Sequence, residues 1–242
     1  MIKRESIGRE SIQSNNNQDV IWQHFQAYYP ESFEGAKPRL NYIIREISSK
    51  KKSSVPRVLN IGAGDGYFEI TSKRLLWDIF TLDPDGATIN RLLGKRIKAY
   101  KGYIEQMPFD DSSFDFVVAS EVLEHLDEEQ RYKGLKEVVR VLDKNGWLIG
   151  TVPFFEKLHL NYVLCPKCGE YFHRWGHKKS FKINAIKSEL FPFFSNINVK
   201  KTAFVNFQGS NLWGIIEGLI RLILAKYGAR ISSTNIYFIA RK

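Results

Sequence analysis

The sequence contains only two cysteines in 242 residues, and both lie in one Cys165-x-x-Cys168 segment. A network of disulfides therefore cannot hold this protein together, and the spacing favours a metal-binding or redox role for the two thiols. The sequence also lacks any run of about 18 uninterrupted apolar residues, which excludes a simple transmembrane helix. Its first residues are polar and charged, without the apolar stretch of a secretory signal, so we expect a cytoplasmic protein.

Acidic residues are in the minority, with 26 Asp and Glu against 36 Lys and Arg, for a formal net charge of +10. Such a surface attracts nucleic acid, phospholipid or phosphorylated substrates, and it equally describes an ordinary soluble basic protein. A hydrophobic content of 43% lets the chain bury one substantial core. We therefore expect one main domain with small additions.

Short apolar runs alternate with helical patterns from residue 57 onward, which is typical of parallel strands joined by crossover helices. We predict a doubly wound α/β fold with a seven-stranded sheet, parallel except for the final strand, and helices on both faces. The predicted strands cover 57–61, 79–83, 97–100, 114–120, 146–154, 197–207 and 235–241. The predicted regions are a disordered start and helical cap (1–54, with helices at 20–29 and 38–47), a ligand-binding core (55–155), a Cys/His insertion (156–182) and a C-terminal part of the sheet with an apolar helix (183–242).

A glycine-rich loop follows the first predicted strand of the core. Gly62, Gly64 and Gly66 form GxGxG, whereas Tyr67 stands where a GxGxxG dinucleotide fingerprint requires glycine. Glycines let the backbone turn tightly and approach a ligand without an intervening Cβ. Asp83 ends the next strand, where its carboxylate can accept two hydrogen bonds from a ribose diol. The sequence therefore predicts a nucleoside-containing cofactor at the carboxyl ends of the strands.

Three further segments complete the pattern: GYIEQMPF at 102–109, FDFVV at 114–118 and EVLEHL at 121–126. Together with the loop and Asp83, they resemble the Rossmann-like (class I) S-adenosylmethionine-dependent methyltransferases over residues 55–155. The resemblance implies a methyltransferase fold, transferase activity and S-adenosyl-L-methionine as cofactor. It assigns the cofactor contacts to Asn60, Gly62, Ala63, Gly64, Gly66, Asp83, Pro84, Ile104, Glu105 and Ser120.

Two positions depart from the family pattern. Asn60 stands where the family usually has Asp or Glu, so a neutral amide must do the orienting. Tyr103 stands where an Asp often meets the adenine amino group, so stacking or a backbone contact takes over.

His125 is the candidate catalytic residue. The methyl group of the cofactor sits on a sulfonium, so catalysis is mainly alignment, plus removal of a proton if the acceptor is a hydroxyl. His125 lies just past the fourth strand and is our candidate for taking that proton. The alternative is a histidine that only holds the loop by hydrogen bonds. We expect O-methylation of a small-molecule, lipid-linked or glycan hydroxyl.

The insertion carries a candidate zinc site. Cys165, Cys168, His173 and His177 offer two thiolates and two imidazoles, the number and type of ligand for tetrahedral structural zinc. A redox CxxC is the rival interpretation, but the strand-to-helix setting of a thioredoxin-like site is missing. The run GHKKSF resembles a methyltransferase segment that faces the acceptor, so His177 is either a zinc ligand or an active-site residue. In the second case His159 completes the zinc site.

A second cation is implied by Glu121-x-x-Glu124-His125. This run resembles one in ubiquinone-pathway O-methyltransferases and small-RNA 2′-O-methyltransferases, where it binds a divalent cation together with a later histidine. Glu121, Glu124 and His125, with His177 as the later histidine, would do the same here. Many relatives carry EHL without a metal, so both alternatives stay open.

Two surface features bear on the partner. A basic run is interleaved with Trp175 and Phe181, and it either contacts phosphates, as in RNA, or forms a solvated rim around the insertion; its residues are Arg174, His177, Lys178, Lys179 and Lys182. The apolar helix at 211–226 is too short to span a bilayer, and it either covers a lipidic acceptor, forms a dimer interface, lies on a membrane or packs in the core. An RNA methyltransferase and a non-catalytic zinc-containing binding module are therefore the alternatives to a small-molecule or lipid-linked acceptor.

Overall fold

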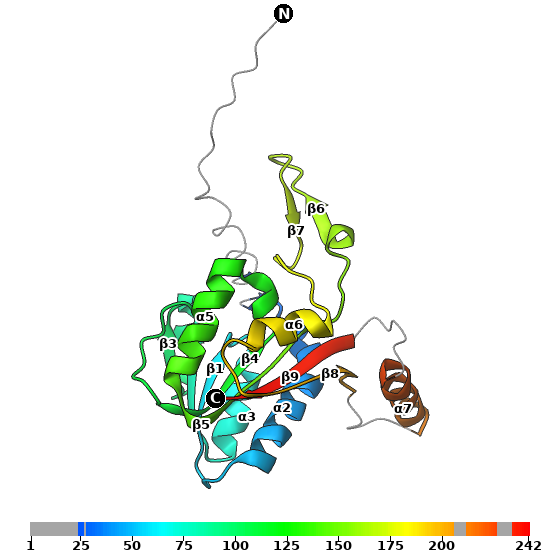
Figure 1. The fold of residues 1–242 in the computed structure, drawn as a ribbon. Helices are drawn as coiled ribbons and strands as arrows, with labels where there is room; N and C mark the ends of the chain where they lie inside the picture. The colour runs from blue at the N-terminus through cyan, green and yellow to red at the C-terminus, as the bar shows by residue number, and fades with distance from the viewer. Residues whose placement is uncertain (1–23, 27, 206–211, 227–233) are drawn as a thin grey trace, which may run out of the picture.

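The computed structural model describes residues 24–26, 28–205, 212–226 and 234–242, and a seven-stranded sheet lies at its centre (Figure 1). The strand order is β3-β2-β1-β4-β5-β9-β8. Strand β9 runs antiparallel to both of its neighbours, whereas the other described pairs of this sheet are parallel. The strands are β1 (Arg57–Ile61), β2 (Asp78–Asp83), β3 (Lys98–Lys101), β4 (Phe114–Ser120), β5 (Leu142–Pro153), β8 (Asn196–Ala203) and β9 (Thr234–Arg241). The predicted mostly parallel sheet, with its antiparallel final strand, is confirmed.

Helices cover both faces of the sheet. On one face, α5 and α6 pack against side chains such as Leu59 and Val117, and on the other, α2 and α3 pack against their sequence neighbours Val58 and Phe116. Successive strand residues point to opposite faces, so buried strands need apolar residues at nearly every position. The helices are η1 (Pro30–Ala36), α2 (Lys37–Lys50), α3 (Tyr67–Arg74), α4 (Gly86–Gly94), η2 (Leu123–His125), α5 (Glu128–Val141), η3 (Leu158–Asn161), α6 (Ile183–Leu190) and α7 (Leu212–Lys226).

The predicted element boundaries hold closely in the core. The predicted strands at 57–61 and 114–120 match β1 and β4 residue for residue, and the helix predicted at 38–47 lies inside α2. Of the helix predicted at 20–29, only residues 24–26, 28 and 29 are described, and 24–26 and 28 are helical. The start up to residue 17, for which we predicted disorder, lies outside the described residues.

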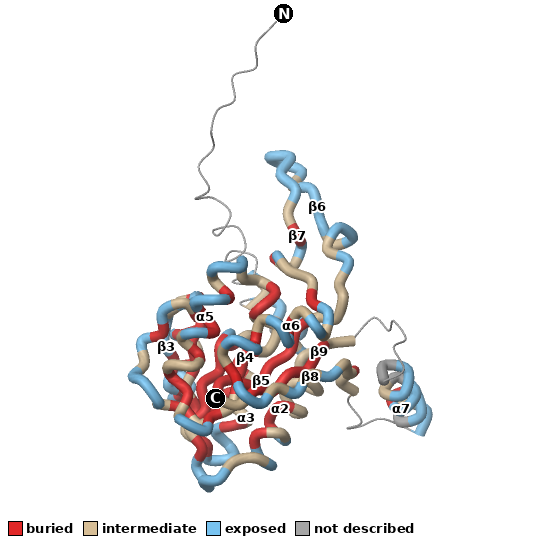
Figure 2. The backbone as a smooth tube through the Cα atoms, in the orientation of Figure 1, coloured by how far each residue is buried: buried red, intermediate tan, exposed pale blue. Residues whose placement is uncertain are grey.

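The insertion forms a hairpin that the sequence patterns did not predict. Strands β6 (Tyr162–Leu164) and β7 (Tyr171–His173) pair antiparallel, and the hairpin projects from the carboxyl-end side of the sheet (Figures 1 and 2). Its outer part is exposed, whereas His173 at its base is buried.

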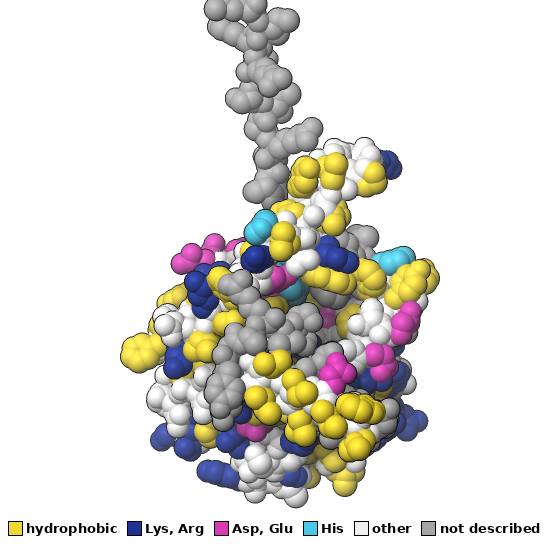
Figure 3. Space-filling model, turned by 90° about the vertical axis from the view of Figure 1, so that its right-hand side faces the viewer, with side chains coloured by type: hydrophobic (Ala, Val, Ile, Leu, Met, Phe, Trp, Pro, Cys, Tyr) yellow, Lys and Arg dark blue, Asp and Glu magenta, His cyan; other side chains and the backbone are white. Residues whose placement is uncertain are grey.

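Helix α7 stands at the side of the molecule, beside β8. Figure 3 views this side and shows hydrophobic side chains gathered over it. Several large apolar side chains of α7 are exposed, among them Leu212, Trp213, Leu219 and Ile223. Within the described residues, the structure contains no helix with the length and apolar character needed to cross a membrane.

Candidate active site

A pocket of about 590 Å³ opens at the carboxyl ends of β1, β2 and β4. These strands are adjacent, and the chain leaves β1 toward β2 and β3 on one side and returns to β4 on the other. Doubly wound sheets bind ligands at this point, because the two connections diverge and leave a crevice. Nine of the ten predicted cofactor residues line the pocket: Asn60, Gly62, Ala63, Gly64, Asp83, Pro84, Ile104, Glu105 and Ser120.

Gly66, the tenth, does not line the pocket. It has a φ of +83°, and a Cβ there would lie 2.7 Å from Leu92 Cδ2. Gly66 is therefore required for the turn into α3 and for its packing against α4. Gly62 and Gly64 have φ values of +81° and +53° and do line the pocket.

Asp83 holds the glycine loop as well as facing the pocket. Its buried carboxylate accepts hydrogen bonds from the backbone N–H groups of Ala63 (2.8 Å) and Asp85 (2.8 Å). Burial raises the pKa of this carboxyl, and the two backbone bonds oppose the rise. Each oxygen keeps a second lone pair, so a ribose diol can still bind there.

Asn60 orients the loop through a buried glutamate. Its amide donates to Glu69 Oε1 (2.6 Å) and to the Gly62 carbonyl (3.1 Å), and Thr81 donates to the same glutamate oxygen. Burial raises the pKa of Glu69 to about 7. An acidic side chain of α3 thus lies beside Asn60, a contact that the sequence patterns did not reveal, but it does not line the pocket.

Arg91 is a loop residue that our sequence analysis missed. Its guanidinium donates to the backbone carbonyls of Gly64 (2.8 Å) and Asp65 (2.6 Å), and so fixes the outer half of the loop. A basic residue in the last turn of α4 gives no local signal of this contact, because 27 positions separate it from Gly64.

The part of the pocket around residues 103–105 combines an apolar floor with a polar rim. Ile104 is buried, Glu105 accepts a hydrogen bond from Gln130 (2.7 Å), and the exposed Tyr103 also lines the pocket. A flat ring can pack on Ile104 or stack on Tyr103 here.

Aromatic side chains line the remaining wall of the pocket. Phe25 and Trp175 lie 6.1 Å apart, centroid to centroid, and both line the pocket together with Phe33. Phe25 and Phe33 come from the N-terminal cap and Trp175 from the insertion, which places both of these segments over the same opening.

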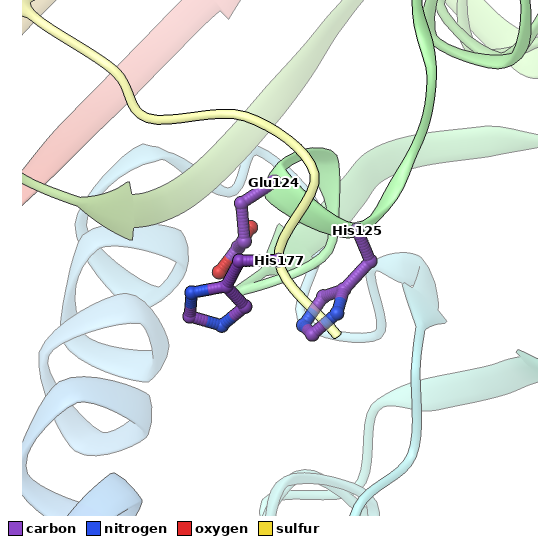
Figure 4. A group of neighbouring side chains, drawn as sticks. All are labelled: Glu124, His125 and His177. Atoms are coloured by element: carbon purple, nitrogen blue, oxygen red, sulfur yellow. The ribbon is translucent and has the colours of Figure 1, made fainter. Parts of the chain in front are cut away.

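Backbone hydrogen bonds bring His177 to the pocket. The N–H groups of Lys178 (2.7 Å) and Lys179 (3.1 Å) both donate to the carbonyl of Glu124. This clamp fixes the segment after β7 against η2, so Glu124, His125 and His177 present potential ligand atoms within 4.8 Å of one another (Figure 4). The alternative in which His177 is an active-site residue is the one this geometry favours.

Glu124 is the unusual member of this trio. It is fully buried, and neither carboxylate oxygen has a hydrogen-bond partner. Burial, reinforced by the charge of Glu121, raises the pKa of Glu124 well above its ordinary value. An orphaned buried carboxylate is costly unless a proton or a cation compensates it, so the trio fits a divalent cation.

His125 is neutral at physiological pH. Burial, together with the nearby His177, lowers its pKa to about 3, although the ring is also bonded to the backbone of Gly176. A base this weak removes a hydroxyl proton poorly near neutral pH, whereas its neutral ring offers a lone pair to a cation.

Glu121 is not part of the trio, contrary to the prediction. It accepts hydrogen bonds from Thr151 (2.8 Å) and Asn235 (3.1 Å), and its φ of +58° turns it away from the path of a regular helix. These partners come from β5 and β9, which no local spacing in the ExxEH run could anticipate.

The four predicted zinc ligands are not brought together, which corrects that prediction. His173 pairs with Tyr162 at the base of the hairpin, whereas Cys165 begins the turn three residues further on. Three residues of strand span about 10 Å, far more than the separation of ligands around one zinc ion. His159 is exposed in η3, and in the described part of the chain neither cysteine joins any group of three potential ligands.

Glu156, His173 and His177 form a second group, whose potential ligand atoms lie within 4.8 Å of one another. Glu156 Oε2 forms a short hydrogen bond with His177 Nδ1, and Glu156 Oε1 lies 3.4 Å from His173 Nε2. His173 Nδ1 accepts from two backbone N–H groups, so the ring proton is on Nε2, facing Glu156. Although burial alone would raise it, the hydrogen bond from His177 lowers the pKa of Glu156.

The basic run predicted to contact RNA is engaged within the chain. Lys178 donates to Gln130 (3.3 Å), Lys179 lies 3.6 Å from Glu189, and Lys182 lies over the Phe155 ring. Glu189 offsets the charge of Lys179, whereas Gln130 and the Phe155 ring are neutral, and Lys182 stays exposed.

Comparisons with known proteins agree with this architecture. Residues 59–150 match the family model described as a methyltransferase domain. The chain is 25% identical over 171 residues to a ubiquinone biosynthesis O-methyltransferase of Rickettsia bellii, covering 67% of this chain and 69% of that one. It is 28% identical over 98 residues to a probable S-adenosylmethionine-dependent methyltransferase of Mycobacterium tuberculosis, covering 40% and 35%.

Solved structures share the fold. A methyltransferase from Archaeoglobus fulgidus matches with a TM-score of 0.63 at 20% identity, over 88% of this chain and 98% of that one. The 1,6-didemethyltoxoflavin-N1-methyltransferase from Burkholderia thailandensis, solved with S-adenosylhomocysteine, matches with a TM-score of 0.61 at 14% identity, over 98% of this chain and 93% of that one. The comparisons favour an enzyme over a non-catalytic binding module. Together with the pocket, they identify this chain as an S-adenosylmethionine-dependent methyltransferase with a class I fold.

Proposed function

We propose that this enzyme methylates a hydroxyl oxygen of a small aromatic acceptor, with a divalent cation held by Glu124, His125 and His177. The observation that carries the proposal is the trio itself: the buried Glu124 carboxylate has no hydrogen-bond partner and lies beside two imidazoles, His125 and His177, that line the pocket. When bound, the cation would act as a Lewis acid on the acceptor hydroxyl and make it easier to deprotonate.

The chain's own residues supply alignment. The glycine loop and Asp83 would hold the methionine and ribose parts of the cofactor, and Phe25, Phe33 and Trp175 line the wall where an aromatic ring would pack. Alignment of acceptor oxygen, methyl carbon and sulfur is the largest contribution a protein makes to this reaction.

Glu156 supports the trio through a hydrogen bond to His177. Because it holds His177 at Nδ1, the other ring nitrogen of His177 is available to the trio. A carboxylate behind a ligating histidine fixes the ring orientation and raises its basicity, and loss of such a partner costs roughly 10–100-fold in metal affinity or activity.

The relative from Rickettsia bellii is named as an O-methyltransferase, which supports oxygen as the acceptor atom. RNA is less favoured because two lysines of the basic run lie near carboxylates, Lys178 at 3.9 Å from Asp127 and Lys179 at 3.6 Å from Glu189. The exposed apolar side chains of α7 would suit a lipid-linked form of the acceptor.

The test is methyl transfer from labelled S-adenosylmethionine to an aromatic compound with two adjacent hydroxyls, with Mg²⁺ or Mn²⁺ and with a chelator. We expect transfer only with the metal, and a fall of roughly 100-fold or more in Glu124→Gln and His177→Ala, with a smaller fall in Glu156→Gln. His159→Ala is the matched control, because His159 is exposed and belongs to no ligand group.

Calorimetry measures cofactor binding and cation binding separately. S-adenosylmethionine should bind the trio variants as it binds the wild type, while Mn²⁺ binding is lost. Full activity in the chelator, or label entering RNA rather than small molecules, would overturn the proposal.

A further inference from the structure

The two cysteines lie at the exposed tip of the hairpin, away from the pocket. They follow β6 and lead into β7 through the turn Cys165-Pro-Lys-Cys168-Gly169. Leu164 pairs with Tyr171 just below them. This tip plays no part in the proposed function, and it needs its own explanation.

The turn is shaped to hold a thiolate. The N–H of Gly169 donates to the Cys165 carbonyl (2.9 Å), and the N–H of Cys165 donates to the Glu170 carbonyl (2.8 Å). Gly169 has a φ of +73°, which favours glycine. Backbone N–H groups of Lys167 and Cys168 point at the Cys165 sulfur. Thiolates presented in this way are ligands for zinc.

One chain supplies only half of such a site. Structural zinc has four ligands, and the sequence has no third cysteine. No other potential ligand of the described residues groups with the pair, and His173 already faces Glu156. Two further thiolates can therefore come only from outside this chain.

The surface around the tip fits a second copy. Leu164 and Tyr171 are paired across the two strands and so share one face of the ribbon, and they are 51% and 69% exposed. An isolated two-stranded hairpin is marginally stable in water, so this one gains from a partner. A two-fold axis places the same patch on both subunits, and it would bring both cysteine pairs together.

We propose that Cys165 and Cys168 bind one zinc ion together with the same two cysteines of a second copy of this chain. Four thiolates around Zn²⁺ carry a net negative charge, which Lys167 of each copy offsets. The apolar side chains of β6 and β7 pack across the two-fold axis and exclude water from the thiolates.

The test measures zinc content and molar mass of the full chain under reducing conditions. We expect about one zinc ion per two chains, as four thiolates around one ion require, and a mass twice the 28.1 kDa of one chain. Cys168→Ser should lose both the zinc and the dimer while still binding S-adenosylmethionine, which shows that it is folded. Glu170→Gln, in the same turn but with no ligand role, should keep both.

The His177→Ala variant tests the proposed zinc site separately from the proposed cation site of the pocket. It should retain the zinc and the dimer while losing the divalent cation of the proposed active site, so either proposal can fail alone. A protein free of zinc, a monomer with one zinc ion per chain, or a zinc-containing Cys168→Ser variant would overturn the inference.

Discussion

At the scale of single residues, buried charge is placed where it serves the site. Glu69 and Glu124 are both fully buried carboxyls, yet their surroundings differ. Glu69 receives two hydrogen bonds on one oxygen, whereas Glu124 receives none on either side-chain oxygen. The first therefore supports the loop, and the second is the carboxylate that the proposed cation would compensate.

The raised pKa of Glu69 predicts a pH dependence of stability. Between its ordinary pKa of 4.5 and about 7, the unfolded chain ionises this carboxyl while the folded chain keeps it protonated. The contribution of this carboxyl to the free energy of unfolding is therefore fully present below pH 4.5 and is lost as the pH rises to 7, by about 3 kcal/mol in total.

Glu69→Gln should remove this loss. Urea unfolding at pH 5, 6, 7 and 8 measures the free energy of unfolding of both proteins. The value for the variant should rise relative to that of the wild type up to pH 7, and the difference between them should then stay constant. Glu129→Gln, an exposed glutamate on α5, should follow the wild type throughout. A difference in free energy of unfolding between Glu69→Gln and the wild type that does not change from pH 5 to pH 8 would contradict the raised pKa of Glu69.

At the scale of elements, helix termini fix the loops that carry the site. Asp127 caps α5 by accepting from the Gln130 N–H (2.9 Å), and the Gln130 side-chain oxygen accepts in return from the Asp127 N–H (3.0 Å). This capping box lies directly after η2 and so ends the segment that carries Glu124 and His125.

Asp127→Ala should lower the free energy of unfolding by about 1 kcal/mol, because one of the first N–H groups of α5 loses its acceptor. Chemical denaturation measures this change. Asp110→Ala, on an exposed loop with no capping contact, should unfold like the wild type. An equal loss in both variants would show that the cap is not the cause.

At the scale of the whole molecule, stability comes from the two layers on the sheet rather than from α7. Ile47 of α2 is fully buried in the core, whereas Ile220 of α7 is 49% exposed. Removing atoms from a packed site leaves a cavity, and removing them from a half-exposed site does not.

Ile47→Ala should therefore cost about 2–4 kcal/mol, and Ile220→Ala should change the free energy of unfolding by less than about 0.5 kcal/mol. Both substitutions remove the same atoms from a helix, so each serves as the control for the other in thermal or urea unfolding. A large loss in Ile220→Ala would mean that α7 is packed as part of the core.

The sequence by itself determined the sheet, the cofactor pocket and most residues around it. Strand periodicity, the GxGxG turn and the acidic strand end are local signals, because each depends on neighbours within a few positions. Asp83, Gly62 and Gly64 could therefore be assigned to the pocket from the order of residues alone, whereas Gly66 was assigned to it wrongly.

Only the tertiary structure decided which residues lie beside His173 and His177. His177 joins Glu124 through backbone bonds across more than 50 positions, and Glu156 holds it from the other side. The spacing of Cys165, Cys168, His173 and His177 suggested one zinc site, but the paired strands hold cysteines and histidines at opposite ends of a hairpin. Ligand spacing along a chain limits which residues can meet, and the conformation between them decides which do.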